Sequence, residues 1–180
     1  MEIVKTSLSG VYIINNFNAQ DSRGTFVKMF NKESFLQENL DFDIRESYYS
    51  ISKKNVIRGM HFQTPPHDHE KLVYVPQGKI LDLIVDLRPN SKTYKNYISV
   101  EISGENKKSV IIPKGLAHGF RSLENDTITV YNVSTEYNPN FDYGISYNSF
   151  GFNWEIEQPI LSKRDAQFIS LEDFCVKNPF

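Results

Sequence analysis

Short segments in which apolar and polar residues alternate recur along most of this chain of 180 residues. Alternation with a period of two puts successive side chains on opposite faces and is typical of β-strands. In the clearest example, 79–87, leucine and valine share one face, while isoleucine alternates with Asp82 and Asp86 on the other. Similar segments predict strands at 11–15, 25–30, 46–52, 56–63, 71–75, 97–103, 109–112, 127–134 and 144–147. We therefore expect an all-β fold, a jelly-roll β-barrel or sandwich whose interior can hold a ligand.

Helical signals are few and short. Asn31 can cap a helix of about two turns, with Phe35 and Leu36 facing the interior. A Ser-x-x-Asp pattern at 162–165 has the form of a capping box, which marks a second helix start. Because no internal repeat, low-complexity stretch or linker interrupts the chain, we expect one domain over residues 1–180 with a few short peripheral helices.

Charge and cysteine content exclude several classes of protein. Lys and Arg total 20 and Asp and Glu total 22, so the net charge is −2. This balance argues against a protein that coats nucleic acid or an anionic membrane, because both tasks need a strong basic excess. Cys175 is the single cysteine, which rules out an intrachain disulfide and a cysteine-based zinc site. No apolar run approaches the roughly 20 residues that span a bilayer, so we expect a cytoplasmic protein.

Histidine is scarce and unevenly placed. Its four positions all fall in the middle third of the chain: His61, His67, His69 and His118. A regular strand over 56–63 would put Arg58 on the same face as Met60 and Phe62, with His61 and Gln63 on the opposite face. Two glycines flank His118 and would let the backbone turn sharply and approach a ligand closely.

One interpretation joins the histidines through a metal ion. A Pro-x-Gly-x-x-His pattern at 113–118, together with His67-x-His69, resembles the ligand pattern of metal-binding cupins and could hold zinc, iron or manganese. That pattern also needs a glutamate several residues after the histidine pair. Here the corresponding stretch, 72–75, reads Leu-Val-Tyr-Val, and Glu70 lies too close to the pair to replace it. The missing ligand argues against this alternative.

The other interpretation is acid–base chemistry without a metal. A histidine can remove an activated proton at neutral pH, for example one next to a carbonyl group. A cation must then stabilise the enolate oxygen that develops. His61 with Lys71 or Arg58 supplies both groups, and Tyr131, in the predicted strand 127–134, could return a proton to the opposite face.

Five motifs in the same order resemble the dTDP-4-dehydrorhamnose 3,5-epimerase family of cupins. They cover the chain from about residue 10 to about residue 170. The first motif is Asp-x-Arg-Gly-x-Phe at 21–26, and the second is Arg-Gly-Met-His-Phe-Gln at 58–63 together with Lys-Leu-Val at 71–73. The third and fourth are the segments 78–88 and 112–120, and the fifth is Pro-Ile-Leu-Ser-Lys-Arg-Asp-Ala at 159–166.

The resemblance implies an epimerase that acts on a nucleotide-linked 4-keto-6-deoxy sugar and needs no metal or organic cofactor. By the family pattern, His61 is the general base and Asp165 orients it, Lys71 stabilises the enolate, and Tyr131 is the acid. The implied substrate-binding residues are Arg23, Phe26, Lys28, Arg58, Gln63, His67, His69 and His118. In the family, the residues near the start often reach the nucleotide across a homodimer interface formed by exchanged N-terminal strands.

The sequence departs from the family pattern at four places that we expect at or near the substrate pocket. Lys28 replaces an acid, 46–50 reads Glu-Ser-Tyr-Tyr-Ser where Gln-Asp-Asn-His-Ser is usual, His69 replaces glutamine, and Asn132 replaces a frequent lysine. We interpret this as retained chemistry with a changed substrate. Relatives act on GDP- or CDP-linked sugars, including 4-keto heptoses of capsules, so the nucleoside and the sugar length stay open.

Three alternatives also remain open: a metal-dependent cupin isomerase or oxygenase, a non-catalytic sugar-binding cupin, and a single-centre epimerase or 3,4-ketoisomerase of the same fold.

Overall fold

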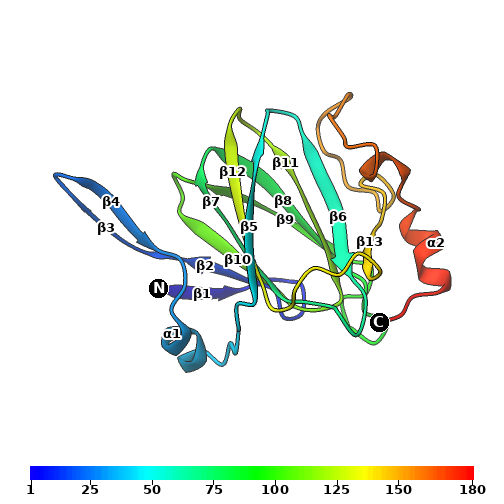
Figure 1. Ribbon diagram of the computed structural model, residues 1–180, viewed down its shortest axis with the longest axis horizontal. Coiled ribbons are helices and arrows are strands. Elements are labelled where there is room, and N and C mark those ends of the chain that lie inside the picture. The colour runs from blue at the N-terminus through cyan, green and yellow to red at the C-terminus, as the bar shows by residue number, and fades with distance from the viewer.

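Two antiparallel sheets pack face to face in the computed structural model, which describes residues 1–180 (Figure 1). The six-stranded sheet has the order β1 (Glu2–Lys5), β2 (Tyr12–Asn15), β10 (Lys108–Ile112), β7 (Lys71–Gln77), β12 (Thr127–Val133) and β5 (Glu46–Ser52). The five-stranded sheet has the order β13 (Asp142–Gly144), β6 (Ile57–Gln63), β11 (Leu116–Ser122), β8 (Lys79–Asp86) and β9 (Tyr97–Ser103).

The remaining elements lie outside this sandwich. Strands β3 (Phe17–Asp21) and β4 (Gly24–Lys28) form a separate hairpin that projects away from the sheets (Figure 1). The helices are α1 (Lys32–Gln37), the single 3₁₀ turn η1 (Asp165–Gln167) and α2 (Leu171–Val176). The predicted all-β jelly roll with short peripheral helices is confirmed. Neither α-helix has the length and apolar character needed to cross a membrane.

Two hydrophobic cores explain why both faces of the interior strand β8 carry apolar residues. Ile80 and Ile84 pack between the sheets, in a cluster that also holds Phe120 and Tyr131. Leucine and valine side chains on the opposite face of β8 pack in a second cluster beneath the C-terminal segment. The two faces predicted for 79–87 are therefore confirmed, and burial of both faces follows from the layer added by the C-terminal segment.

Strand β6 does not alternate regularly, and the predicted face of Arg58 is wrong. His61 pairs with His118 and Arg58 with Phe120, so two residues of β6, Gly59 and Met60, oppose the single residue Gly119 of β11. This bulge at Gly59, whose φ is +134°, moves Arg58 to the face of His61. The neighbouring Met60 and Phe62 stay in the second core, as expected of a shared face.

Strand β11 was not predicted, because its glycines indicated a turn. Gly115, with φ +80°, does lie in a turn, but Gly119 is within the strand. A Cβ atom at Gly119 would lie 2.7 Å from the Met60 sulfur and 2.8 Å from the Arg58 carbonyl oxygen. Glycine at this position therefore permits close contact between two strands, which a single sequence does not distinguish from a turn.

The helix predictions are partly correct. The Asn31 side chain caps α1 by accepting a hydrogen bond from the Ser34 amide at 2.9 Å, and Phe35 is fully buried. Leu36, however, is 48% exposed, so its predicted inward position is wrong: α1 is short and only one of its faces meets the core. The Ser-x-x-Asp pattern produces only the turn η1, but its hydrogen bond fixes Asp165 at the site described next.

Candidate active site

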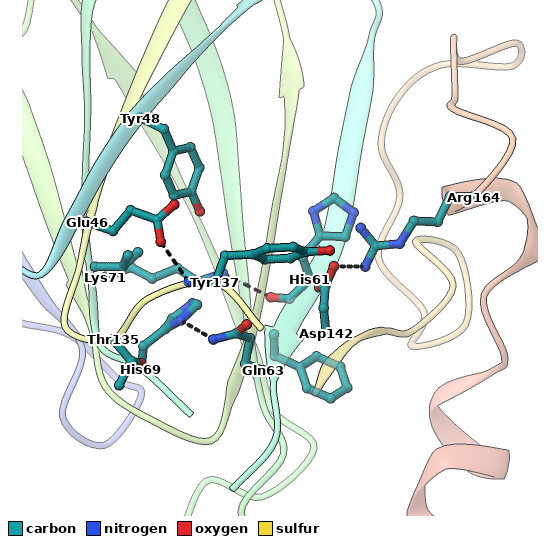
Figure 2. Close-up of a pocket in the computed structure, with 12 residues that line it drawn as sticks. Glu46, Tyr48, His61, Gln63, His69, Lys71, Thr135, Tyr137, Asp142 and Arg164 are labelled. Atoms are coloured by element: carbon teal, nitrogen blue, oxygen red, sulfur yellow. Dashed lines mark hydrogen bonds and ion pairs between the residues drawn. The ribbon is translucent and has the colours of Figure 1, made fainter. Parts of the chain in front are cut away.

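The open end of the sandwich holds a cleft with two lobes, each a cavity of about 270 Å³. Tyr48, His61 and Lys71 border both lobes. The acid–base lobe is lined in addition by Ser50, Arg58, His118, Phe120 and Tyr131. The side lobe, shown in Figure 2, is lined in addition by Glu46, Phe62, Gln63, His69, Val133, Thr135, Tyr137, Asp142 and Arg164. Six strands of the two sheets (β5, β6, β7, β11, β12 and β13) and the C-terminal segment therefore build one cleft.

His61 is held by Asp165, which lies 104 residues further along the chain. The imidazole Nε2 is 2.9 Å from one carboxylate oxygen of Asp165, and the other oxygen accepts the Gly59 amide at 3.1 Å. The Asp165 amide in turn donates to the Ser162 hydroxyl at 3.0 Å. Burial acts to raise the pKa of Asp165, but the hydrogen bonds from His61, Gly59 and Ser162 outweigh it and lower this pKa below its ordinary value.

The pairing with Asp165 decides which nitrogen of His61 can act as a base. A carboxylate accepts the Nε2 proton, so the lone pair of the neutral ring is on Nδ1, which has no hydrogen bond within the protein. The Phe168 ring packs edge-on against the imidazole, with centroids 5.6 Å apart. His61 is thus a half-buried, oriented base at the junction of the two lobes.

Lys71 brings a buried cation to the same place. Its side chain is 5% exposed, and its ammonium group donates to the His61 carbonyl oxygen at 3.1 Å. Burial lowers the pKa of Lys71 to about 8, while Asp142 and Asp82 act in the opposite direction. The amine is therefore charged at neutral pH and lies where it can meet an anionic oxygen in either lobe.

Tyr131 reaches the acid–base lobe from β12, in the opposite sheet to His61. Its hydroxyl lies 3.4 Å from the Ser50 hydroxyl, and its ring packs against His118 and Tyr48. Burial raises the pKa of Tyr131 well above its ordinary value, and Ser50 offsets only part of this. The phenol therefore stays protonated at neutral pH.

Sequence reasoning missed Asp82, which holds His118. The His118 Nε2 and a carboxylate oxygen of Asp82 are 2.6 Å apart, and both side chains are buried. Burial lowers the pKa of His118, although Asp82 acts to raise it. An aspartate between two core isoleucines, Ile80 and Ile84, was the available signal, because such a carboxylate needs a buried partner.

The remaining residues of the 61–69 segment separate into two places. Gln63 accepts the Asn138 amide through its side-chain oxygen at 2.6 Å and donates through its nitrogen to the His69 Nδ1 at 3.1 Å. His69 and Gln63 both border the side lobe. His67 packs on Phe141 instead and borders neither lobe.

Arg23, Phe26 and Lys28 lie on the hairpin β3–β4, which projects away from the sheets (Figure 1), and they border neither lobe. Arg23 forms an ion pair with Asp21 at 2.6 Å, and Phe26 is 59% exposed. Of the other departures, Asn132 is buried but borders neither lobe. The cleft itself thus holds the changes at Glu46, Tyr48 and His69.

The histidines do not assemble into a ligand set. His118 is engaged by Asp82, His69 by Gln63 and His67 by Asn138. No three histidine, cysteine, aspartate or glutamate side chains are arranged to hold a metal ion. The ligand set of the metal-dependent alternative is therefore not brought together.

His69 and His118 make stability depend on pH. Burial and, to a smaller extent, the nearby charge of Lys71 together lower the pKa of His69 to about 3, and burial also lowers the pKa of His118. Unfolded histidine titrates near 6.5, so between that value and the folded value the unfolded state binds more protons. The free energy of unfolding therefore falls as the pH drops below about 6.5.

We predict that His69→Gln reduces this effect. Glutamine does not titrate, so the fall in melting temperature between about pH 7 and about pH 5 should be smaller than in the wild type. Thermal unfolding at both pH values measures it. Equal falls in variant and wild type would show that His69 does not contribute.

The family model and the curated relatives point to one family. The sequence model of the dTDP-4-dehydrorhamnose 3,5-epimerase family matches residues 5–173. A dTDP-4-dehydrorhamnose 3,5-epimerase of Methanothermobacter thermautotrophicus is 37% identical over 175 residues, 94% of each chain. The chain belongs to this family.

Solved structures of the family share the fold over almost the full length. An epimerase of Mycobacterium tuberculosis superposes with a TM-score of 0.95 at 29% identity, covering 100% of this chain and 93% of the other. An epimerase of Legionella pneumophila, solved with dTDP-4-keto-L-rhamnose, gives a TM-score of 0.89 at 34% identity, covering 95% and 93%. This member of the family is accordingly an isomerase that acts on nucleotide sugars.

Proposed function

We propose that the protein inverts C3, C5 or both in a 4-keto-6-deoxy sugar linked to a nucleoside diphosphate. The observation that carries this is the position of His61 and Tyr131, which enter one lobe from opposite sheets with Lys71 beside them. Inversion at carbon needs a base on one face of the sugar and an acid on the other, with a cation at the oxygen that receives the charge.

The steps follow from the chemistry of the ketone. The C4 carbonyl acidifies the C–H bonds at C3 and C5. His61 Nδ1 takes the proton, the C–H electron pair forms the enolate double bond, and the carbonyl electrons move to O4, where the Lys71 ammonium stabilises the negative charge. Tyr131 then gives its phenolic proton to the opposite face of the same carbon and the carbonyl re-forms. Proton exchange with water restores both residues, so the reaction needs no metal or organic cofactor.

The pH dependence of the rate should report Lys71. Because only the ammonium form stabilises the enolate, kcat/KM is expected to fall as the pH rises through about 8. Lys71→Arg keeps its charge to much higher pH and should shift this basic limb upward by more than a pH unit, even if its rate is lower. An unshifted limb in Lys71→Arg would assign the titration to another group.

We also propose that the substrate is not the usual dTDP-4-keto-6-deoxyglucose. Glu46, Tyr48 and His69 line the cleft at positions where the sequence departs from the family pattern. A polar side lobe beside Lys71 gives room for a longer sugar such as a heptose. Lys28 is a hydrogen-bond donor only, and guanine presents two acceptors, O6 and N7, on one edge. These features favour a GDP-linked sugar.

A panel of dTDP-, CDP- and GDP-linked 4-keto-6-deoxy sugars tests the specificity. We expect the GDP-linked compounds to turn over at least about tenfold faster, a difference of about 1.4 kcal/mol in transition-state binding. Rates with dTDP-4-keto-6-deoxyglucose that equal or exceed the others would contradict the proposed specificity and leave the proposed chemistry intact.

We further propose a homodimer with exchanged N-terminal strands. The hairpin β3–β4 carries exposed Phe17 and Phe26, and an isolated two-stranded hairpin is marginally stable in water. Strand β5 has an unpaired edge with exposed Ile51, beside the cleft. A partner's hairpin on this edge would bring Arg23, Phe26 and Lys28 to the substrate.

Sedimentation should give twice the mass of one chain for the wild type and a monomer for Ile51→Asp, whose charge would lie in the proposed interface. A monomeric wild type would refute the dimer.

Because nucleoside diphosphate sugars are activated donors for glycosyl transfer, we propose that the reaction belongs to cytoplasmic biosynthesis of a cell-surface polysaccharide, capsule or lipopolysaccharide.

A further inference from the structure

We propose that Tyr48 is a positioning residue for Tyr131: its ring holds the acid in place and thereby determines whether a removed proton is replaced on the opposite face of the sugar. This inference rests on the proposed function. It concerns a position where the family pattern has asparagine, so the family's chemistry does not assign it.

The two tyrosines face each other across neighbouring strands. Tyr48 on β5 is directly opposite Tyr131 on β12 in the antiparallel register. Their rings are stacked, with centroids 4.9 Å apart and planes 21° apart. Directly opposed side chains of two strands are the pairs that interact most strongly, so each ring restricts the other.

The Tyr131 hydroxyl is held only weakly. Its one hydrogen-bond partner, the Ser50 hydroxyl, is 3.4 Å away, whereas hydroxyl pairs usually lie about 2.7–2.8 Å apart. A bond of this length does not fix the direction of the phenol. The position of the acid therefore depends on the packing of its ring.

Two aromatic neighbours supply that packing, and they differ in how firmly they are held. His118 contacts the Tyr131 ring edge-on at 6.1 Å and is itself fixed by buried Asp82. Tyr48 covers the ring face-on, is 43% exposed and lines both lobes, as Figure 2 shows for the side lobe. Removing Tyr48 would open one face of Tyr131 to water and leave the edge contact with His118 as its one ring–ring contact.

Tyr48 also suits the task because it stays neutral. Burial and, to a smaller extent, the charges of Glu46 and Asp142 together raise its pKa to about 12. Its hydroxyl makes no hydrogen bond within the protein, so the stack, and not a bond between the two phenols, carries the effect. No second negative charge then forms beside Tyr131 when Tyr131 releases its proton.

The experiment compares inversion with exchange in D₂O. His61 alone can remove a proton and return a deuteron to the same face, which is exchange without inversion, whereas inversion also needs Tyr131. The probe is whichever of the dTDP-, CDP- and GDP-linked 4-keto-6-deoxy hexoses the wild type converts fastest. Both rates are read by NMR from the deuterium content and the configuration at C3 and C5.

We expect Tyr48→Leu and Tyr48→Thr to lower inversion about 10- to 100-fold relative to exchange, since small displacements of a catalytic group have effects of this size. Tyr48→Phe keeps the stacked ring and should stay within about twofold of the wild type. The control is Tyr143→Ala, which removes an exposed tyrosine from β13 outside both lobes. Two non-aromatic variants are used so that misfolding of one leaves the test in place.

An unchanged ratio in the folded non-aromatic variants would overturn the proposal. An equal loss in Tyr48→Phe would also overturn it, because the hydroxyl and not the ring would then matter. A wild type that shows no exchange with any of the three hexoses or with the corresponding heptoses would refute the proposed function instead, so the two failures are distinguishable.

Discussion

Exchange of solvent deuterium into the sugar is expected to fall about 10²- to 10⁴-fold when His61 is replaced by alanine. The reason is geometric. Asp165 pairs with Nε2 of His61 and leaves Nδ1 as the basic nitrogen of the acid–base lobe. The other histidine of this lobe, His118, is already paired with buried Asp82. NMR in D₂O measures the loss at C3 and C5. Inversion should be lost to the same extent, since it cannot occur without proton removal.

Binding separates this effect from a damaged cleft. The variant should still bind the matching nucleoside diphosphate within about threefold of the wild type, because His61 contributes to the chemical step more than to ground-state binding. The rate of deuterium exchange is expected to fall less in Asp165→Ala than in His61→Ala, since Asp165→Ala removes the group that orients the base and leaves the base itself. Exchange that persists near the wild-type rate in His61→Ala would remove His61 from the mechanism.

Tyr131→Phe is expected to separate exchange from inversion. The variant keeps the ring that packs against Tyr48 and His118 but loses the proton donor. His61 can still form the enolate, with Lys71 beside it, and return a deuteron to the face from which the proton came. We therefore predict deuterium incorporation within about tenfold of the wild type, with inversion reduced about 10²- to 10⁴-fold.

The same NMR spectra give both quantities, so the comparison needs no separate assay. Inversion that continues at the wild-type rate in Tyr131→Phe would show that another acid, or water, protonates the second face. Loss of exchange and inversion together, in a variant that melts at the wild-type temperature, would place Tyr131 in proton removal instead.

Local patterns in the sequence predicted the parts of the fold that depend on local interactions. The alternation at 79–87 identified β8 and the residues that share each of its faces, and the Asn31 cap identified α1. These features depend on side-chain periodicity and on hydrogen bonds between residues a few positions apart.

Features that depend on distant contacts were not predicted. The bulge that turns Arg58 toward His61 exists because β6 pairs with β11 around Gly59 and Gly119, which are 60 positions apart in the sequence. Asp82 belongs to the site only because β8 places it beneath His118. Local patterning cannot show either contact.

The candidate site was predicted mainly through the resemblance to the family. Chemistry alone indicated a histidine base, a lysine or arginine cation and a tyrosine acid, but not which residues meet. The structure brings His61, Lys71, Tyr131 and Asp165 together, and it places His67 outside the cleft. It adds Tyr48, whose stacking on Tyr131 follows from strand register alone.

The most direct test of the mechanism with His61 as base and Tyr131 as acid is the stereochemical position of deuterium in the product of a single turnover. In a two-base mechanism, His61 keeps the proton that it removes from one face of the carbon. Tyr131, whose hydroxyl has exchanged with D₂O, delivers a deuteron to the opposite face. Each inverted carbon should therefore carry one deuterium, with the ketone still at C4 and with the same result after treatment with a chelator. An inverted carbon that retains its original protium, or a product whose ketone has moved to C3, would contradict the account.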